Sequence, residues 1–213
     1  MPVMSRFERA FCCGAVWRSS SAVIARQLHA QPLGRDVLEI GAGSGCVAQQ
    51  LLSKNPELAL TAMDIDPHMT QAAATRLLGF ANASAKTADA TAMPFPDNSF
   101  GSVVSCLMLH HIVDWERALS EVARVLRPGG TFLGYDLVRT PLAGVFHRLD
   151  GSPHRLIVPR DFGAECARNG LTISLQSRLL GHVMRFVARK DTANAGDTSA
   201  SLREPMVGAE RHR

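Results

Sequence analysis

The chain lacks the features that would mark several large classes of protein. No stretch approaches the ~20 consecutive apolar residues that a membrane-spanning helix needs. Aromatic residues make up only 6% of the 213 residues, so an interleaved aromatic platform for stacking nucleic-acid bases is not expected. The five cysteines show no C-x-x-C spacing, which argues against a disulfide framework and a thiolate zinc site and favours a cytoplasmic location. No cluster of metal-ligating residues is evident, and we expect no metal.

Charge of one sign is also scarce over most of the chain. Lysine and arginine outnumber aspartate and glutamate by 23 to 19, a net charge of +4 that is spread along the sequence. Such a mild surplus does not indicate nucleic acid as a partner. The first 35 residues depart from this balance, because five arginines there face the single acidic residue Glu8. Three interpretations of this segment stay open: a helical lid that packs on the domain, reversible contact of residues 1–30 with an acidic membrane surface, and a transit-like leader.

From residue 36 onward, short apolar runs alternate with segments of helical spacing. The apolar runs predict strands at residues 36–40, 58–63, 84–88, 102–107, 131–137, 171–175 and 183–188. The helical segments lie at residues 46–52, 67–78, 114–126 and 160–168. This alternation predicts an α/β fold, a Rossmann-like doubly wound and mostly parallel sheet of about seven strands whose last strand is antiparallel. The domain is expected to span residues 36–190, followed by a disordered tail at 191–213 that has no apolar periodicity.

Glycines and acids follow the first three predicted strands. Gly41, Gly43 and Gly45 form a turn after the first strand, where glycine allows backbone amides to approach a ligand. The spacing G-x-G-x-G differs from the G-x-G-x-x-G of dinucleotide-binding proteins, so the turn alone is a weak signal. Asp64 follows the second strand, at a position suited to ribose hydroxyls, and Asp89 follows the third. A tight joint, a helix cap and a surface turn are the structural alternatives, but three suitable groups at consecutive strand ends favour a nucleotide-like ligand.

Five segments in order resemble the motifs of class I S-adenosylmethionine-dependent methyltransferases. They are residues 37–45 (VLEIGAGSG), 64–69 (DIDPHM), 89–100 (DATAMPFPDNSF), 109–112 (LHHI) and 126–130 (LRPGG). The resemblance covers residues 36–137 closely and 158–190 loosely. It is nearest to the small-molecule group that includes the quinone-biosynthesis methyltransferases.

The resemblance implies S-adenosyl-L-methionine as the cofactor and assigns residues to its parts. Around the methionine portion it places Glu39, Gly41, Ala42, Gly43 and Gly45. It places Asp64 at the ribose, Ile65 against the adenine, Asp89 at the adenine amine, Ala90 as an amide donor, and Cys106 and Leu107 facing the sulfonium.

The acceptor is expected to be small or lipophilic, with a histidine as general base if a hydroxyl is methylated. His110 and His111 follow the fourth predicted strand, and His111 is the favoured base of the two because it matches the family's more frequent histidine. His147 and His154, after the fifth strand, are weaker candidates. Residues 105–108 (SCLM) do not match the Asn-Pro-Pro-Tyr type of element, which disfavours DNA adenine or a glutamine amide as the acceptor.

One residue departs from the family pattern. Gly101 stands where the family usually has aspartate, at the amino end of the fourth strand, and we expect a local structural change there. The departure keeps open an alternative function, a catalytically degenerate cofactor-binding protein that acts as a regulatory or scaffolding partner. A nicotinamide-dependent oxidoreductase is a further alternative, disfavoured by the glycine spacing.

Overall fold

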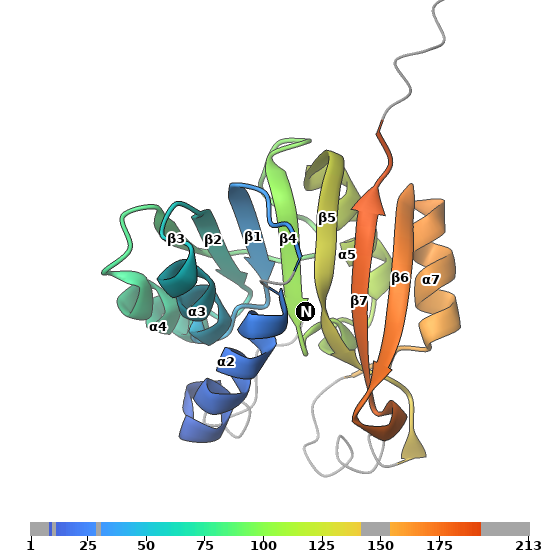
Figure 1. Cartoon of the computed structure of the whole chain (residues 1–213), viewed down its shortest axis with the longest axis horizontal. Helices are drawn as coiled ribbons and strands as arrows, with labels where there is room; N and C mark the ends of the chain where they lie inside the picture. Colours follow the sequence, from blue (N-terminus) through green and yellow to red (C-terminus); the bar gives the residue numbers. More distant parts are fainter. Residues whose placement is uncertain (1–8, 10–11, 29–30, 142–153, 193–213) are drawn as a thin grey trace, which may run out of the picture.

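The structure is a computed structural model, and it describes residues 9, 12–28, 31–141 and 154–192. Its centre is a seven-stranded sheet with the strand order β3-β2-β1-β4-β5-β7-β6 (Figure 1). The strands are β1 (Asp36–Ile40), β2 (Ala59–Asp64), β3 (Ala83–Thr87), β4 (Phe100–Cys106), β5 (Leu126–Leu137), β6 (Leu171–Arg178) and β7 (Val183–Lys190). The helices are α2 (Ala15–Leu28), α3 (Cys46–Lys54), α4 (Pro67–Leu77), α5 (Trp115–Val125) and α7 (Pro159–Arg168), with short 3-10 turns η1 (Leu109–His111) and η2 (Leu179–Gly181).

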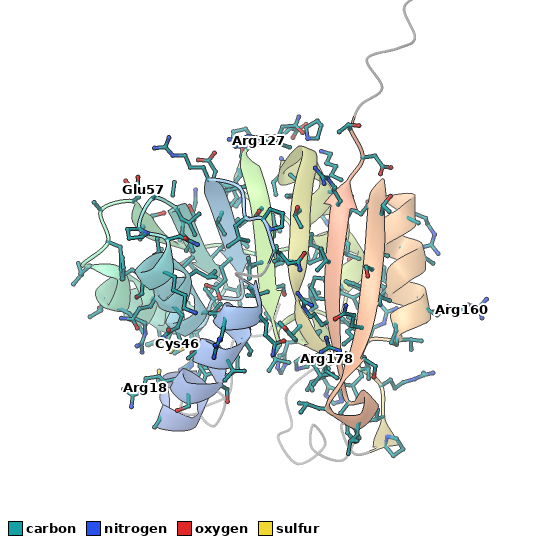
Figure 2. All side chains as sticks on the ribbon, in the orientation of Figure 1. Arg18, Cys46, Glu57, Arg127, Arg160 and Arg178 are labelled. Atoms are coloured by element: carbon teal, nitrogen blue, oxygen red, sulfur yellow. The ribbon has the colours of Figure 1, made fainter. Side chains whose placement is uncertain are left out.

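Strands β1 to β5 run parallel to one another, and β7 is antiparallel to both β5 and β6. The predicted α/β fold with an antiparallel last strand is therefore confirmed. The carboxyl ends of β1 to β5 meet along one edge of the sheet, which we call the carboxyl edge, and the opposite edge is the amino edge. Arg127 lies toward the amino edge and Arg178 at the carboxyl edge (Figure 2). In an open α/β sheet, ligands bind beyond the carboxyl edge.

Helices cover the two faces of the sheet and bury two apolar cores. Helices α2, α3 and α4 contribute buried side chains to the core on one face, including Trp17, Leu51 and Leu77. Helices α5 and α7 contribute to the core on the other face, including Leu119 and Phe162. Apolar side chains recur at helical spacing along these segments, so each helix places a continuous apolar stripe against the strands.

Some element boundaries differ from the predicted ones. The predicted helix 114–126 begins at Trp115 and ends at Val125, and β5 then starts at Leu126, five residues before the predicted start at residue 131. The reason is tertiary, because Leu126 pairs with Phe100 across the sheet and its carbonyl accepts a hydrogen bond from Lys190 Nζ at 2.7 Å. Strand β6 likewise extends to Arg178, because its whole length pairs with β7.

The terminal segments are described only in part. Helix α2 buries Trp17, Ala25 and Leu28 against the domain. The predicted tail at 191–213 lies outside the described residues apart from residues 191 and 192, and so does most of residues 1–11. No helix in the described ranges is both long and apolar enough to cross a membrane.

Gly101 lies in the irregular pairing between β4 and β5, at the amino edge. A Cβ on Gly101 would lie 3.0 Å from the Cα of Gly34, in the connection from α2 to β1. The neighbouring Ser102 hydroxyl accepts a hydrogen bond from the Gly34 amide at 2.9 Å. The departure at residue 101 thus accompanies a close backbone approach far from the carboxyl edge, as expected from its place in the sequence.

Candidate functional site

The glycine turn between β1 and α3 has the backbone conformation that its sequence predicts. Gly41, Gly43 and Gly45 have φ values of 63°, 53° and 75°, in the left-handed region that other residues avoid. A Cβ on Gly41 would lie 2.0 Å from Met108 Cγ, so glycine is also required there for packing. Ala42, between them, is buried, and its amide donates to the Met63 carbonyl of β2 at 2.9 Å.

Asp64, at the end of β2, ties this turn to the next one. Its Oδ2 accepts a hydrogen bond from the Gly43 amide at 2.8 Å, and its Oδ1 accepts one from the Asp66 amide at 2.9 Å. Burial raises the pKa of Asp64, and the two amide donors oppose that effect. Each carboxylate oxygen has a second lone pair with which to accept from a ligand hydroxyl. Ile65 lies half-buried between the two aspartates.

Asp66 joins the site through a contact that sequence reasoning did not find. It caps α4 as predicted, accepting from the His68 amide at 2.9 Å. Its second oxygen lies 2.7 Å from Arg9 Nε, across 57 residues of sequence. Burial raises the pKa of Asp66, but the His68 amide and the Arg9 guanidinium outweigh burial, so the net shift is downward. No local signal marks Arg9 among the other N-terminal arginines.

A second N-terminal residue contacts the glycine turn directly. The Cys12 carbonyl accepts a hydrogen bond from the Ser44 hydroxyl at 2.6 Å. A Cβ on Gly43 would lie 3.8 Å from the Cys12 sulfur. Arg9 and Cys12 therefore lie against the loops at the ends of β1 and β2.

Glu39, the second-last residue of β1, has a buried carboxyl group, and the residue is only 2% exposed. The pKa of Glu39 is raised to about 8. Burial is the main cause, the charge of Asp64 adds to it, and a hydrogen bond from the Ala48 amide opposes it. Glu39 Oε2 is buried and has no hydrogen-bond partner among the described residues. A buried acceptor left unpaired is costly, and a ligand ammonium would satisfy it.

At the end of β3, the chain turns through Asp89 and Ala90. One oxygen of Asp89 accepts from both the amide and the hydroxyl of Thr91, each at 2.8 Å. Burial raises the pKa of Asp89, but the hydrogen bonds from Thr91 oppose this effect, and the net shift of the pKa is downward. Ala90 is buried.

The end of β4 is apolar and conformationally unusual. Burial raises the pKa of the Cys106 thiol well above its usual value, and the nearby Glu39 and Asp136 raise it further. Leu107 has a φ of 54°, and its amide donates to the Tyr135 carbonyl at 2.8 Å. A leucine in the left-handed region is uncommon, and such strain is often found at ligand sites.

His110 and His111 follow in η1, and the structure separates their environments. His110 is 2% exposed, and its Nδ1 lies 2.6 Å from Asp136 Oδ1 at the end of β5. His111 is half-buried and its ring lies 4.1 Å from that of His110, centre to centre. Asp136 also accepts from the amides of Leu109 and Leu137, each at 2.7 Å. The sequence analysis did not single out Asp136. An acidic residue next to the carboxyl end of a predicted strand was the signal that could have found it.

The weaker histidine candidates differ in position. His154 is half-buried, and the next residue, Arg155, donates its amide to the His110 carbonyl at 2.7 Å. His147 lies outside the described residues. Within the described ranges, no group of three or more His, Cys, Asp or Glu side chains is arranged to hold a metal ion.

The predicted cofactor residues thus come from the ends of β1, β2, β3 and β4, along one edge of a Rossmann-like sheet. Residues 38–134 match the family model described as a methyltransferase domain. This match, together with the relatives described below, confirms the resemblance to the class I S-adenosylmethionine-dependent methyltransferases that was found in the sequence.

Among proteins of similar sequence, the chain is 38% identical over 120 residues to an uncharacterised methyltransferase of Mycobacterium tuberculosis, covering 54% of this chain and 58% of that one. It is 38% identical over 104 residues to the ubiquinone/menaquinone biosynthesis C-methyltransferase of Hahella chejuensis, covering 47% of this chain and 42% of that one. The chain therefore spans about half the length of these relatives. In fold, it resembles phosphoethanolamine N-methyltransferase 2 of Haemonchus contortus, solved with S-adenosyl-L-methionine, with a TM-score of 0.68, 17% identity, and coverage of 82% of this chain and 53% of that one.

Proposed function

We propose that this protein transfers a methyl group from S-adenosyl-L-methionine to a small or lipophilic acceptor, with His110 as the general base. The observation that carries the proposal is the buried pair of His110 and Asp136 at the same edge of the sheet as the glycine turn. A carboxylate-oriented histidine there suits proton removal from an acceptor, which binding of the cofactor alone does not require.

The residues along the carboxyl edge fit the parts of the cofactor. Glu39, with its unpaired buried oxygen, suits the cationic methionine end. The Asp64 carboxylate suits the ribose hydroxyls, and the turn at Asp89 and Ala90 suits the adenine. When bound, the cofactor supplies a methyl group on a sulfonium, which an acceptor displaces in line with the sulfur.

The chain's own part in the reaction is alignment and proton removal. The buried Cys106 and Leu107, which has a positive φ, stand at the end of β4 and would form the apolar side of the site next to η1. Holding acceptor and methyl group in line can contribute several kcal/mol. Asp136, by accepting from Nδ1 of His110, favours the tautomer whose Nε2 is basic and stabilises the ring once it is protonated.

His110 replaces His111 as the preferred base, because the buried carboxylate of Asp136 orients the His110 ring. The ring of His111 lies against that of His110, and we propose a packing role for His111 in place of a catalytic one.

The lipophilic acceptor is supported by two observations. The matched relative from Hahella chejuensis is named for quinone biosynthesis. In this chain, the residues around the histidines are apolar and buried, including Met108, Leu109 and Ile112. Gly101, which had kept the degenerate alternative open, lies at the amino edge and therefore gives that alternative no support.

Calorimetric titration with S-adenosylmethionine and S-adenosylhomocysteine, with NADH as control, tests the cofactor first. Mass-spectrometric assay of methyl transfer to demethylated quinones and to simple phenols then tests the acceptor class. We expect His110→Ala to bind cofactor as the wild type does and to lose transfer by ~10²-fold or more, whereas His111→Ala keeps most of it. Cofactor binding without transfer to any lipophilic acceptor would contradict the proposal.

A further inference from the structure

Two neighbouring leucines at the turn between β6 and β7 are exposed to solvent. Leu179 is 73% exposed and Leu180 is 101% exposed. Both have positive φ, 47° and 55°, which is uncommon for any residue other than glycine. A single exposed leucine is ordinary on a protein surface. An adjacent pair that is exposed and held in an unfavourable backbone conformation is unusual and calls for an explanation. We call residues 178–182 the leucine tip.

The leucine tip lies at the carboxyl edge, beside the candidate site. Arg178 pairs with Val183 across the hairpin, and Val183 pairs with Leu137 at the end of β5. The next pair along the strands joins Met184 to Asp136, which holds His110. The tip is therefore one residue pair from the carboxylate that orients the proposed base.

Two exposed arginines lie in or next to the tip, Arg178 within it and Arg139 in the segment that contacts His182. Among the described residues, the Arg178 guanidinium donates to the Ser177 carbonyl and to Gln176 Oε1 and to no carboxylate. Arg139 is exposed too, between Val138, whose amide donates to the His182 carbonyl, and Thr140, whose hydroxyl contacts the His182 ring at 2.8 Å.

Arg160, also exposed, stands at the start of α7, which begins at the carboxyl edge. Figure 2 shows it projecting outward from that helix. Glu116 is paired with Arg155 at 2.7 Å, whereas the exposed Asp161 directly follows Arg160 and offsets its charge. No ion pair to a carboxylate is formed by Arg139, Arg160 or Arg178 within the described ranges. Among the described residues, the edge next to the tip therefore carries the positive charges of Arg139 and Arg178, which no ion pair offsets.

We propose that the leucine tip docks this protein on an anionic lipid bilayer, with Leu179 and Leu180 inserted among the acyl chains and Arg139 and Arg178 at the headgroups. Exposed apolar side chains next to exposed cations are an arrangement that binds acidic membranes. The docked edge is the edge that holds His110, so an acceptor dissolved in the bilayer would reach the site directly. The contact itself does not depend on methyl transfer, whereas its use in delivering an acceptor rests on the proposed function.

Co-sedimentation of the full chain with vesicles tests the proposal. One set contains phosphatidylcholine with 30 mol% phosphatidylglycerol, and the other contains phosphatidylcholine alone. We expect the protein to bind the anionic vesicles, and the binding to weaken as NaCl is raised. Leu179→Ser/Leu180→Ser should weaken partitioning by roughly tenfold or more, and Arg178→Gln by about fivefold.

Matched controls come from the amino edge. Leu78, 82% exposed after α4, is the control for the leucines, and Leu78→Ser should leave vesicle binding unchanged. Arg189, exposed near the end of β7, is the control for Arg178, and Arg189→Gln should change binding less than Arg178→Gln does. Circular dichroism melts of each variant establish that it is folded.

Three results would overturn the proposal. They are equal binding to both vesicle types, unchanged binding of a folded double leucine variant, and a wild-type dimer in light scattering that the double variant converts to a monomer. The last would assign the tip to a second copy of the chain. Cofactor titration of the same variants tests membrane docking separately from the proposed function. The leucines lie in the β6–β7 turn, whereas the proposed cofactor residues lie at the ends of β1 to β4, so the cofactor affinity of the variants should stay within about twofold of the wild type.

Discussion

His110 Nδ1 and Asp136 Oδ1 lie 2.6 Å apart in the interior of the protein, although 26 residues separate them in the sequence. His110 comes shortly after β4, and Asp136 lies near the end of β5. Because β4 and β5 are adjacent and parallel, the sheet brings the two residues together. Both side chains are almost entirely buried. A histidine in this setting has a fixed ring orientation before any acceptor arrives, which is a requirement for efficient proton transfer.

Replacing Asp136 by asparagine should lower kcat by at least ~10-fold, because the amide no longer fixes the tautomer of His110. Asp136 acts through His110, so cofactor Kd and acceptor KM should stay within about threefold of the wild type. Asp161→Asn, at an exposed position in α7, is the matched control and should keep wild-type kcat. An Asp136→Asn variant with a normal kcat would exclude the pair from catalysis.

Asp64→Ala should weaken S-adenosylmethionine binding by ~1–3 kcal/mol, through lost charge-assisted hydrogen bonds to the ribose and a loosened Gly43 amide. Calorimetry would show this as a roughly 5- to 150-fold rise in Kd. The exposed Glu57 provides a control, since Glu57→Ala should bind as the wild type does. Unchanged affinity in Asp64→Ala would refute the ribose assignment.

Glu39 should make the unliganded protein less stable as pH rises from about 4.5 to about 8. Its pKa is raised to about 8 in the folded protein, so in this interval the folded state binds more protons than the unfolded state. The contribution to the free energy of unfolding falls by up to about 1.4 kcal/mol per pH unit across that window. Glu39→Gln should flatten this slope relative to the wild type in urea titrations at a series of pH values. Glu57→Gln should not, and equal slopes in all three proteins would show that Glu39 ionises as an exposed glutamate does.

Gly101→Asp would restore the residue that is usual in the family, and we expect it to destabilise this chain. The new Cβ would lie 3.0 Å from the Cα of Gly34, and crowding of this kind costs typically ~1–3 kcal/mol. Thermal melts should show a drop of about 2–4 °C for each kcal/mol. Gly79→Asp is the comparison, because a Cβ there meets nothing within 4 Å. Cofactor affinity should be unchanged in both variants, and a loss of affinity in Gly101→Asp alone would link the amino edge to the site.

Some of the fold and of the site is local in origin, and the sequence predicted it. The glycines of the first turn, the cap at Asp66 and the alternation of strand and helix depend on φ preferences, hydrogen bonds to near neighbours and side-chain periodicity. The position of Asp64 follows from the same logic, because an acid at the end of a parallel strand must lie at the carboxyl edge. The assignment of Asp64, Asp89 and Glu39 to parts of a cofactor stays a prediction.

Other features were decided only by the tertiary structure. The early start of β5, the pairing of His110 with Asp136 and the contact of Arg9 with Asp66 each join residues far apart in the sequence. The choice between His110 and His111 is of this kind, because adjacent residues with identical side chains differ only in what the fold brings to them. The exposure of Leu179 and Leu180 is another, since an apolar residue is buried or left in water according to whether any other element covers it. Local preferences act between neighbours in the chain, whereas these contacts depend on which strands the sheet places side by side.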